Sequence, residues 1–283
     1  MLKNNKDFDF WADGIERGRK MLNLVEKEIG SLEEKRILDL GCGLGGISIS
    51  FKERCSQVFS LDSDRDRIDG FRKRLLEKNI KGIFPLQAEA MDLPILNDSF
   101  DFVVINGVLE WVGWGKDKDP LPLQNQVLSE AERVIKRGGF LYLAIENRFY
   151  PLNFFRDPHL KIPFVTILPY KVSSWFAYFI RGRPYQTPIH SYWRLKKMLK
   201  KAGFVKIFMY TGLIHYQYPV VSIALDKGCP RFLKRQDIIK IVTEYRKFNL
   251  KKGLSIKVLF LKIIFLLGLA RLFIHSFIVL AEK

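Results

Sequence analysis

Short apolar runs alternate with longer amphipathic stretches through the first half of the chain. The apolar runs predict strands near 36–40, 57–61, 82–86, 100–105 and 139–145. The stretches between them carry apolar residues at helical spacing and predict helices over 45–54, 64–79 and 121–137. Regular alternation of this kind favours a mostly parallel sheet with helices on both faces. Such sheets bind ligands at the carboxyl ends of their strands.

The rest of the chain differs from this core in composition. A helical segment is predicted before the first strand, and a proline-rich and aromatic stretch follows the last one. We expect this stretch to be an insertion that covers the crevice, although a helix filling the flank of the sheet would also fit. A late helix over 190–204 and strands near 205–210 and 219–225 would complete the sheet. The predicted divisions are 1–35 (helical segment), 36–147 (core), 148–189 (insertion), 190–228 (sheet completion) and 229–283 (basic and apolar helical tail).

A glycine-rich turn follows the first predicted strand. Gly41, Gly43 and Gly46 have the spacing G-x-G-x-x-G, which lets backbone approach a ligand closely but is weak evidence alone. The second strand ends in Asp62, where a carboxylate can accept hydrogen bonds from both ribose hydroxyls of a cofactor. Enzymes that use NAD and enzymes that use S-adenosylmethionine (SAM) both need that acceptor, so Asp62 does not separate them.

Asp39, just before the glycines, does separate the two cofactors. Its carboxylate would repel the pyrophosphate of a dinucleotide. SAM carries a sulfonium and an α-ammonium group, both of which an acidic residue near the loop would attract. The loop therefore favours SAM.

Four further segments follow in a characteristic order. They are Gln87–Pro94 (QAEAMDLP), Asp98–Ile105 (DSFDFVVI), Arg133–Leu141 (RVIKRGGFL) and the strand from Tyr142 to Ile145. With the glycine loop, they make residues of about 35–145 resemble the class I SAM-dependent methyltransferases with a type 11 domain. Two positions depart from the family pattern: Glu89 replaces an aspartate, and Arg137 replaces a proline.

The resemblance implies a Rossmann-like, seven-stranded α/β sheet whose last strand is antiparallel, followed here by a helical extension. It also implies SAM as the cofactor. Asp39, Gly41 and Gly43 would lie along the amino-acid end of SAM and Asp62 at its ribose, while Asn106 would contact the SAM backbone. The residues expected around the adenine are Glu89, Ala90 and Met91. Asp39 could instead be a loop-stabilising acceptor.

Catalytic residues are harder to predict, because SAM brings its own electrophile and many methyltransferases do little beyond alignment. Glu110 follows the fourth core strand, where the family lines its methyl-transfer channel, although an exposed helical glutamate is the plainer interpretation. Glu146 ends the fifth strand at the mouth of the crevice. His190 and His159 are candidate bases, or else surface or capping histidines. No metal site is predicted, since Cys42, Cys55 and Cys229 lack metal-ligand spacing.

Positive charge is concentrated toward the end of the chain. Of the formal net charge of +17, residues 190–283 contribute 19 basic against 4 acidic side chains. Residues 231–252 predict a basic helix, and 254–280 are strongly apolar but interrupted by charges such as Arg271. We expect this tail to be a membrane-surface anchor. A true span and a dimerisation or buried core helix are alternatives.

These features predict a methyltransferase that modifies a small or amphiphilic acceptor, such as a lipid-linked glycan or a quinone-type lipid, on oxygen. The cysteine usage and the absence of a secretory signal favour the cytoplasm, with peripheral attachment to the inner face of the cell membrane. An RNA methyltransferase would use the basic tail on phosphates, but few aromatics interleave with its charges. A non-catalytic SAM-binding scaffold is the third hypothesis.

Overall fold

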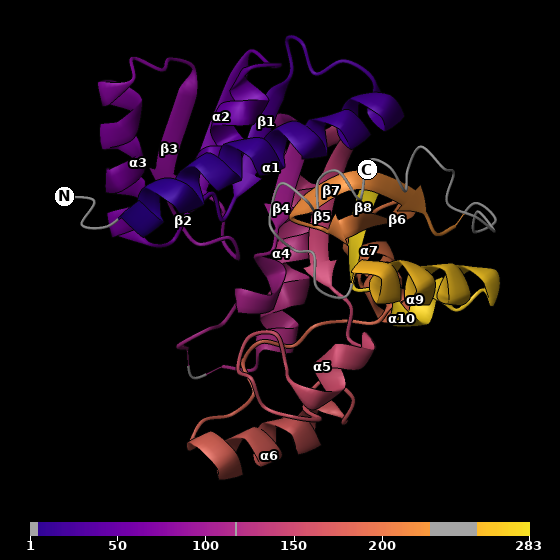
Figure 1. The fold of residues 1–283 in the computed structure, drawn as a ribbon. Coiled ribbons are helices and arrows are strands. Elements are labelled where there is room, and N and C mark those ends of the chain that lie inside the picture. The colour runs from indigo at the N-terminus through magenta and orange to yellow at the C-terminus, as the bar shows by residue number, and fades with distance from the viewer. Residues whose placement is uncertain (1–4, 117, 227–253) are drawn as a thin grey trace.

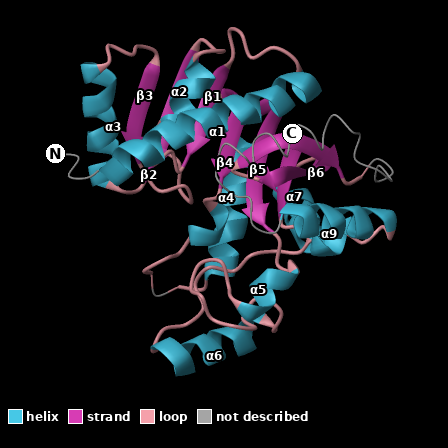
Figure 2. Cartoon of the chain, viewed as in Figure 1, coloured by secondary structure: helices cyan, strands magenta, loops and turns pink. Residues whose placement is uncertain are grey.

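A single eight-stranded sheet organises the computed structural model, which describes residues 5–116, 118–226 and 254–283. The strand order is β3-β2-β1-β4-β5-β8-β6-β7 (Figure 1, Figure 2). Strands β1 to β5 are mutually parallel, whereas β8 is antiparallel to both β5 and β6, and β7 to β6. The bounds are β1 (Arg36–Leu40), β2 (Gln57–Asp62), β3 (Ile83–Gln87), β4 (Phe100–Asn106), β5 (Ile135–Glu146), β6 (Lys206–His215), β7 (Tyr218–Ala224) and β8 (Ser276–Glu282).

Helices cover both faces of this sheet, as the alternation of patterns predicts. The helices are α1 (Asn5–Ile29), α2 (Gly46–Lys52), α3 (Arg65–Glu77), the 3-10 turn η1 (Leu109–Trp111), α4 (Pro120–Val134), α5 (Pro151–Phe155), α6 (Tyr170–Arg181), α7 (Tyr192–Ala202), α9 (Leu254–Leu266) and α10 (Ala270–Phe273). Successive strand residues point to opposite faces. Ile37 therefore packs with α1, α2 and α3, while Leu38 packs with α4, α7 and α9.

Local capping fixes where the helices begin. The Asp64 side chain accepts hydrogen bonds from the backbone of Asp66 and Arg67 at the start of α3. Asp119 caps α4 just before Pro120, and Ser191 caps α7, which ends at Gly203. Each cap satisfies backbone groups that the first or last helical turn cannot pair internally. The late helix predicted over 190–204 is thus confirmed with its serine cap.

The C-terminal part of the chain corrects the sequence interpretation. Residues 276–282, predicted as part of a helical tail, form strand β8 between β5 and β6, with Leu143 opposite Val279 and Phe208 opposite Leu280. A central strand covered on both faces is continuously apolar, so its pattern cannot be told from that of a buried helix. The strand expected near 219–225 exists as β7, but it is an eighth strand at the edge rather than the last of seven.

The preceding part of the tail is helical, as predicted, in α9. Within the described ranges, the chain contains no helix with the length and hydropathy needed to cross a bilayer. The basic segment 231–252 and Cys229 lie outside the described residues. The anchor therefore stays a prediction for the part of the tail before β8.

The insertion lies beyond the end of the sheet rather than against its flank. Figure 1 shows α5 and α6 set apart from the helices that cover the sheet faces. The insertion has a small core of its own, in which Ala177 of α6 packs with Ile162, Val165 and Tyr185 from the flanking loops. On the outside of α6, Trp175 and Phe179 are 68% and 79% exposed.

Candidate functional site

The glycine loop after β1 is held against two neighbouring strand ends. The amides of Gly41 and Cys42 donate hydrogen bonds of 2.7 and 3.0 Å to the carbonyl of Leu61. Gly41 has φ +75°, and a Cβ there would lie 2.5 Å from the Val108 side chain. Gly43 has φ +55°, yet a Cβ there would meet nothing within 4 Å. The loop is therefore packed at Gly41 and open at Gly43, where a ligand can approach the backbone.

Asp62 ends β2 with its carboxylate fixed toward that opening. It is 6% exposed. It accepts hydrogen bonds from the amides of Gly43 (2.9 Å) and Asp64 (3.0 Å). A carboxylate offers about four lone-pair directions, so two remain for hydroxyl groups. This geometry fits the predicted ribose contact.

Asp39 is buried beneath the loop. Its carboxylate accepts a 2.6 Å hydrogen bond from the Ser48 hydroxyl, which itself accepts one from Ser60 at 2.9 Å. Burial raises the pKa of Asp39 to about 6, with a smaller contribution from the nearby charge of Asp62 and partial relief from Ser48. The contacts show an acceptor that joins β1 to α2, the helix that follows the loop. The role of Asp39 toward the SAM ammonium stays a prediction.

The predicted adenine segment runs alongside Asp62. The Ala88 amide donates to the Asp62 carbonyl at 3.1 Å. Glu89 is exposed and pairs with Lys116 at 3.0 Å. Ala90 and Met91 are half-buried and pack against the core. The segment thus lies beside Asp62, and its contact with the adenine stays a prediction.

Asn106 ends β4, the strand that pairs with β1 on the side away from β2. Its side-chain oxygen is buried and makes no hydrogen bond to the described residues. Buried polar atoms are rarely left unpaired in proteins. An ammonium group would satisfy this oxygen, and the open backbone at Gly43 would accept the rest of the ligand. The residues present therefore fit SAM.

A short chain of contacts leads from the cofactor loop to a buried acidic cluster. Next to Asn106, Gly107 has φ +67°, and a Cβ there would lie 2.6 Å from the hydroxyl of Tyr216. That hydroxyl donates a 3.2 Å hydrogen bond to Glu146 at the end of β5. Glu110, three residues beyond Gly107, is fully buried in η1 and is not the exposed helical glutamate that was considered.

Glu110 and Glu146 meet His159, which comes from the insertion. One ligand atom from each residue lies within 4.8 Å of the other two. Burial raises the pKa of Glu110 well above its ordinary value, and the charge of Glu146 raises it further. Burial also raises the pKa of Glu146. It lowers that of His159 to about 4, so the imidazole is neutral at pH 7.

The predicted catalytic set is therefore only partly assembled. Glu110 and Glu146 come together, but His190 lies elsewhere, with its Nε2 2.7 Å from the Gln124 side-chain oxygen. The Gln124 amide nitrogen donates to the carbonyls of Leu109 and Pro188, so its oxygen must accept from His190. Burial and two nearby arginines lower the pKa of His190 to about 3. These contacts favour a structural role for His190.

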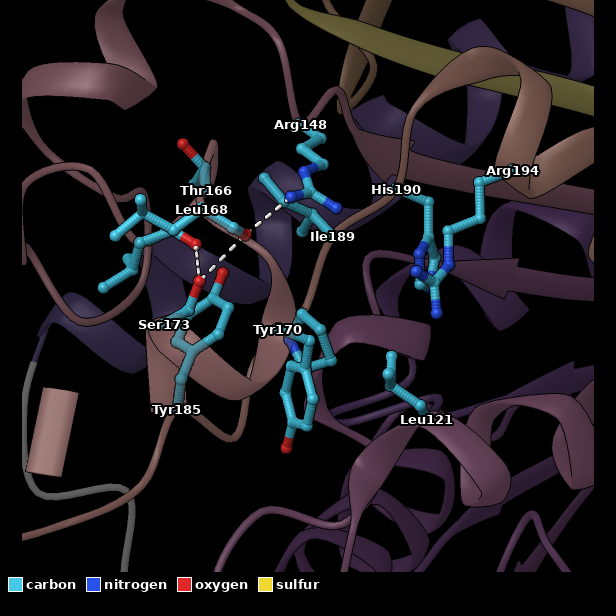
Figure 3. Close-up of a pocket in the computed structure, with 12 residues that line it drawn as sticks. Leu121, Arg148, Thr166, Leu168, Tyr170, Ser173, Tyr185, Ile189, His190 and Arg194 are labelled. Carbon is cyan, nitrogen blue, oxygen red and sulfur yellow. Dashed lines mark hydrogen bonds between the residues drawn. The ribbon is translucent and has the colours of Figure 1, made fainter. Parts of the chain in front are cut away.

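His190 also lines a pocket between the insertion and α7 (Figure 3). Arg148 reaches into it and donates 2.6 and 3.2 Å hydrogen bonds to the carbonyls of Leu168 and Ile167. Tyr170, Tyr185 and Arg194 also line the pocket. The insertion was predicted to shape a substrate site, and that role stays a prediction, for which this pocket is a candidate location. Of the residues that line the pocket, the sequence analysis named His190, as a candidate base.

Comparisons with known proteins agree with this geometry. A family model described as a methyltransferase domain matches residues 38–143. The demethylmenaquinone methyltransferase of Oceanobacillus iheyensis is 30% identical over 189 residues, which cover 62% of this chain and 72% of the relative. The ubiquinone biosynthesis O-methyltransferase of Nitrosomonas europaea is 28% identical over 130 residues, covering 45% of this chain and 50% of the relative. Among eight curated relatives, the aligned region spans 43% to 76% of their length.

A solved structure supports the fold at lower identity. Phosphoethanolamine N-methyltransferase 2 of Haemonchus contortus, in complex with S-adenosylhomocysteine, superposes with a TM-score of 0.54 at 14% identity. The match covers 93% of this chain and 52% of that one. Family model, relative and fold agree with the glycine loop and with the carboxylate of Asp62 beside it. The chain belongs to the class I SAM-dependent methyltransferases, and SAM is its methyl donor.

Proposed function

We propose that this methyltransferase methylates a hydroxyl oxygen of a small amphiphilic acceptor, such as a quinone precursor or a lipid-linked glycan. The observation that carries the proposal is the buried carboxyl pair Glu110–Glu146. Its link to Asn106 supports this assignment: the Tyr216 hydroxyl that donates to Glu146 lies against Gly107, the neighbour of Asn106. A hydroxyl must lose its proton as it becomes an ether, and a carboxyl pair kept from water can take that proton.

SAM supplies a methyl group already activated on a sulfonium. Asp62, Gly43 and Asn106 hold the donor, and the acid pair faces the acceptor. Burial and mutual repulsion keep one proton on the pair, on Glu110 or Glu146, so one carboxylate is free to accept another. As the acceptor oxygen bonds to the methyl carbon, its proton passes to that carboxylate, and the electrons of the carbon–sulfur bond stay on sulfur.

The amphiphilic character of the acceptor rests on exposed apolar side chains and on the relatives. Trp175, Tyr178 and Phe179 on α6 are 61–79% exposed, and Leu266 on α9 is 59% exposed. Exposed apolar groups of this kind mark lipid or partner contacts. Five of the eight relatives have names that refer to menaquinone or ubiquinone methyltransferases. We therefore propose peripheral attachment to the inner membrane face, through these residues and the basic segment that precedes α9.

The pocket in Figure 3 has an open volume of only about 10 Å³, about the size of one water molecule, so it would receive a polar group of the acceptor only after its lining side chains move. Arg148 and Arg194 give it positive charge, and the tyrosines give it flat apolar walls. Its wall residue His190 connects through Gln124 to Leu109, next to Glu110. Head group and reacting hydroxyl would thus be held by adjoining parts of one surface.

The test uses the full chain with SAM labelled in its methyl group. Demethylated quinone precursors, polyprenyl-linked glycans and total RNA are offered separately, with Asp62→Ala as the inactive control. We expect label in the organic phase as a methoxy group. Label in RNA would replace the proposal with the RNA hypothesis, and a methyl on carbon or nitrogen would refute oxygen transfer. Sedimentation with anionic and zwitterionic vesicles tests the membrane attachment separately.

A further inference from the structure

Three side chains that lie far apart in sequence present unpaired ligand atoms to one another. Glu110 comes from η1, Glu146 from the end of β5 and His159 from the insertion. Both oxygens of Glu110, one of Glu146 and Nε2 of His159 are buried and have no hydrogen-bond partner among the described residues outside the cluster, although the two carboxyls can share a hydrogen bond when one is protonated. The side chains of Glu146 and His159 are only 8% and 7% exposed. Buried polar atoms without a partner lower the stability of the folded protein unless a bound group interacts with them.

The spacing of these atoms suits a metal ion. Nε2 of His159 is 3.7 Å from Oε2 of Glu146, and the Glu110 oxygen completes a triangle within 4.8 Å. Ligands bonded at about 2.1 Å in a tetrahedral site lie about 3.4 Å apart. The triangle is therefore slightly wider than a bound cation requires, and small side-chain rotations would close it.

We propose that Glu110, Glu146 and His159 bind one divalent cation. Two carboxylates and a neutral imidazole favour zinc or manganese over magnesium, which prefers oxygen ligands and several waters. Three protein ligands leave an open coordination position, as catalytic rather than structural metal sites do.

Neighbouring residues hold the ligands in place. Tyr216 donates to the second oxygen of Glu146, which leaves Oε2 for a cation. The Asp157 carboxylate accepts a 3.0 Å hydrogen bond from the His159 amide and a 3.2 Å one from the Tyr185 hydroxyl, which fixes the turn carrying the imidazole. Such outer contacts are typical of metal sites. The ring of Trp111 lies 4.8 Å from that of His159 and is itself 40% exposed, so one aromatic layer separates the cluster from solvent.

The cation's role, unlike the site itself, rests on the proposed function. With the cation bound, its charge would replace the proton that the carboxyl pair otherwise shares, so both carboxyls would be ionised. A hydroxyl at the open position would have a lowered pKa. Glu110 would bind the cation with one oxygen and take the hydroxyl proton with the other. Oxygen–carbon bond formation and carbon–sulfur cleavage then proceed as above, with no change in oxidation state.

Metal binding is measured on the full chain after removal of metals with EDTA. Mn²⁺ binding is followed by electron paramagnetic resonance and Zn²⁺ binding by calorimetry. The variants are Glu110→Gln, Glu146→Gln and His159→Asn, with exposed Glu77→Gln on α3 as the matched control. We expect one cation per chain in the wild type and the control. Each cluster variant should weaken binding by about tenfold or more, since even residues that only orient ligands contribute that much.

X-ray absorption spectroscopy of the zinc-loaded wild type identifies the ligand atoms around the metal, so it tests the proposal even if a variant fails to fold. One imidazole nitrogen with oxygen neighbours is expected, whereas sulfur or several imidazoles would overturn the assignment. Wild type that binds no stoichiometric cation would overturn it too, and would indicate that the carboxyls share a proton instead. SAM binding is measured on the same metal-free samples. Failure of the metal site therefore remains distinguishable from failure of the methyl transfer.

Discussion

The main-chain amide of Gly43 donates a 2.9 Å hydrogen bond to the carboxylate of Asp62, nineteen residues later. This bond joins the glycine loop after β1 to the end of β2. The loop conformation and the orientation of the ribose acid therefore depend on each other. A substitution at Asp62 should therefore alter the conformation of the glycine loop, and a substitution at Gly43 should alter the orientation of the Asp62 carboxylate.

Replacing Asp62 by alanine should weaken SAM binding by about 10- to 100-fold, because hydrogen bonds to a charged group contribute about 1.5–3 kcal/mol. The variant would lose the hydrogen bonds from the ribose hydroxyls, and it would also leave the Gly43 amide without its acceptor. Calorimetry of the wild type and the variant measures it. Asp69→Asn, on the exposed side of α3, is the control and should bind SAM normally. Equal affinity of Asp62→Ala and wild type would remove Asp62 from the cofactor site.

Alanine substitutions along the glycine loop should separate packing from ligand binding. Gly41→Ala combines positive φ with the Val108 collision and should lose the most stability. Gly43→Ala has open space, so its stability loss should be only the backbone cost of about 1–2 kcal/mol, with much weaker SAM binding. Gly30→Ala, also at positive φ in open space, should lose similar stability and keep SAM binding. Urea unfolding and calorimetry give both quantities. Normal SAM affinity in Gly43→Ala would contradict this model.

Asp39 should make the stability of the ligand-free protein depend on pH. Its pKa is raised from 3.8 to about 6 in the folded chain, so folding favours its protonated form. This stability is complete below pH 4 and is lost as pH rises through about 6, amounting to about 3 kcal/mol. Asp39→Asn should therefore gain stability relative to the wild type between pH 4.5 and 7.5, while binding SAM more weakly at pH 7. Urea unfolding at several pH values tests this, and a constant difference would contradict it.

Strand β8 should be essential to folding. Phe277 is fully buried, and Phe277→Ala should cost about 3–5 kcal/mol of unfolding free energy. Phe179→Ala, whose side chain is 79% exposed, should stay within about 0.5 kcal/mol of the wild type. Thermal denaturation followed by circular dichroism compares them. If Phe179→Ala also reduced vesicle binding, it would support the proposed membrane face, whereas a neutral Phe277→Ala would argue against β8.

The cofactor half of the fold was predictable because its signals are local. Asp39, Gly41, Gly43 and Asp62 lie at the junctions of strands, and the alternation of β1 with α2 and β2 follows from hydrophobic period alone. Their relative placement then follows from the topology of a parallel sheet. The predicted strands and helices of this region agree with the structure within a few residues at their ends.

The acceptor side was less predictable because its residues meet only through tertiary contacts. Nothing near His159 in sequence indicates that it faces Glu110 and Glu146. Nor does the surrounding sequence show that the imidazole of His190 is hydrogen-bonded to the side chain of Gln124. Residues 276–282 were mistaken for helix because a strand buried on both faces has no alternation. In each case the sequence identifies the residue or segment but does not show which residues or strands it contacts in the fold.

The position of β8 also sets an order for folding during synthesis. In the described sheet, β6 is bonded only to β7 and β8, and β8 alone joins this hairpin to β5. Strands β1 to β5 can assemble as they leave the ribosome, since their pairings are complete without later residues. The β6–β7 hairpin can pack on α1, where the Tyr210 hydroxyl donates a hydrogen bond to Glu28, but it has no neighbouring strand in the sheet until residues 276–282 have emerged and can insert between it and β5. The loop that holds SAM can therefore form early, but the sheet behind Glu146 closes only with the final strand.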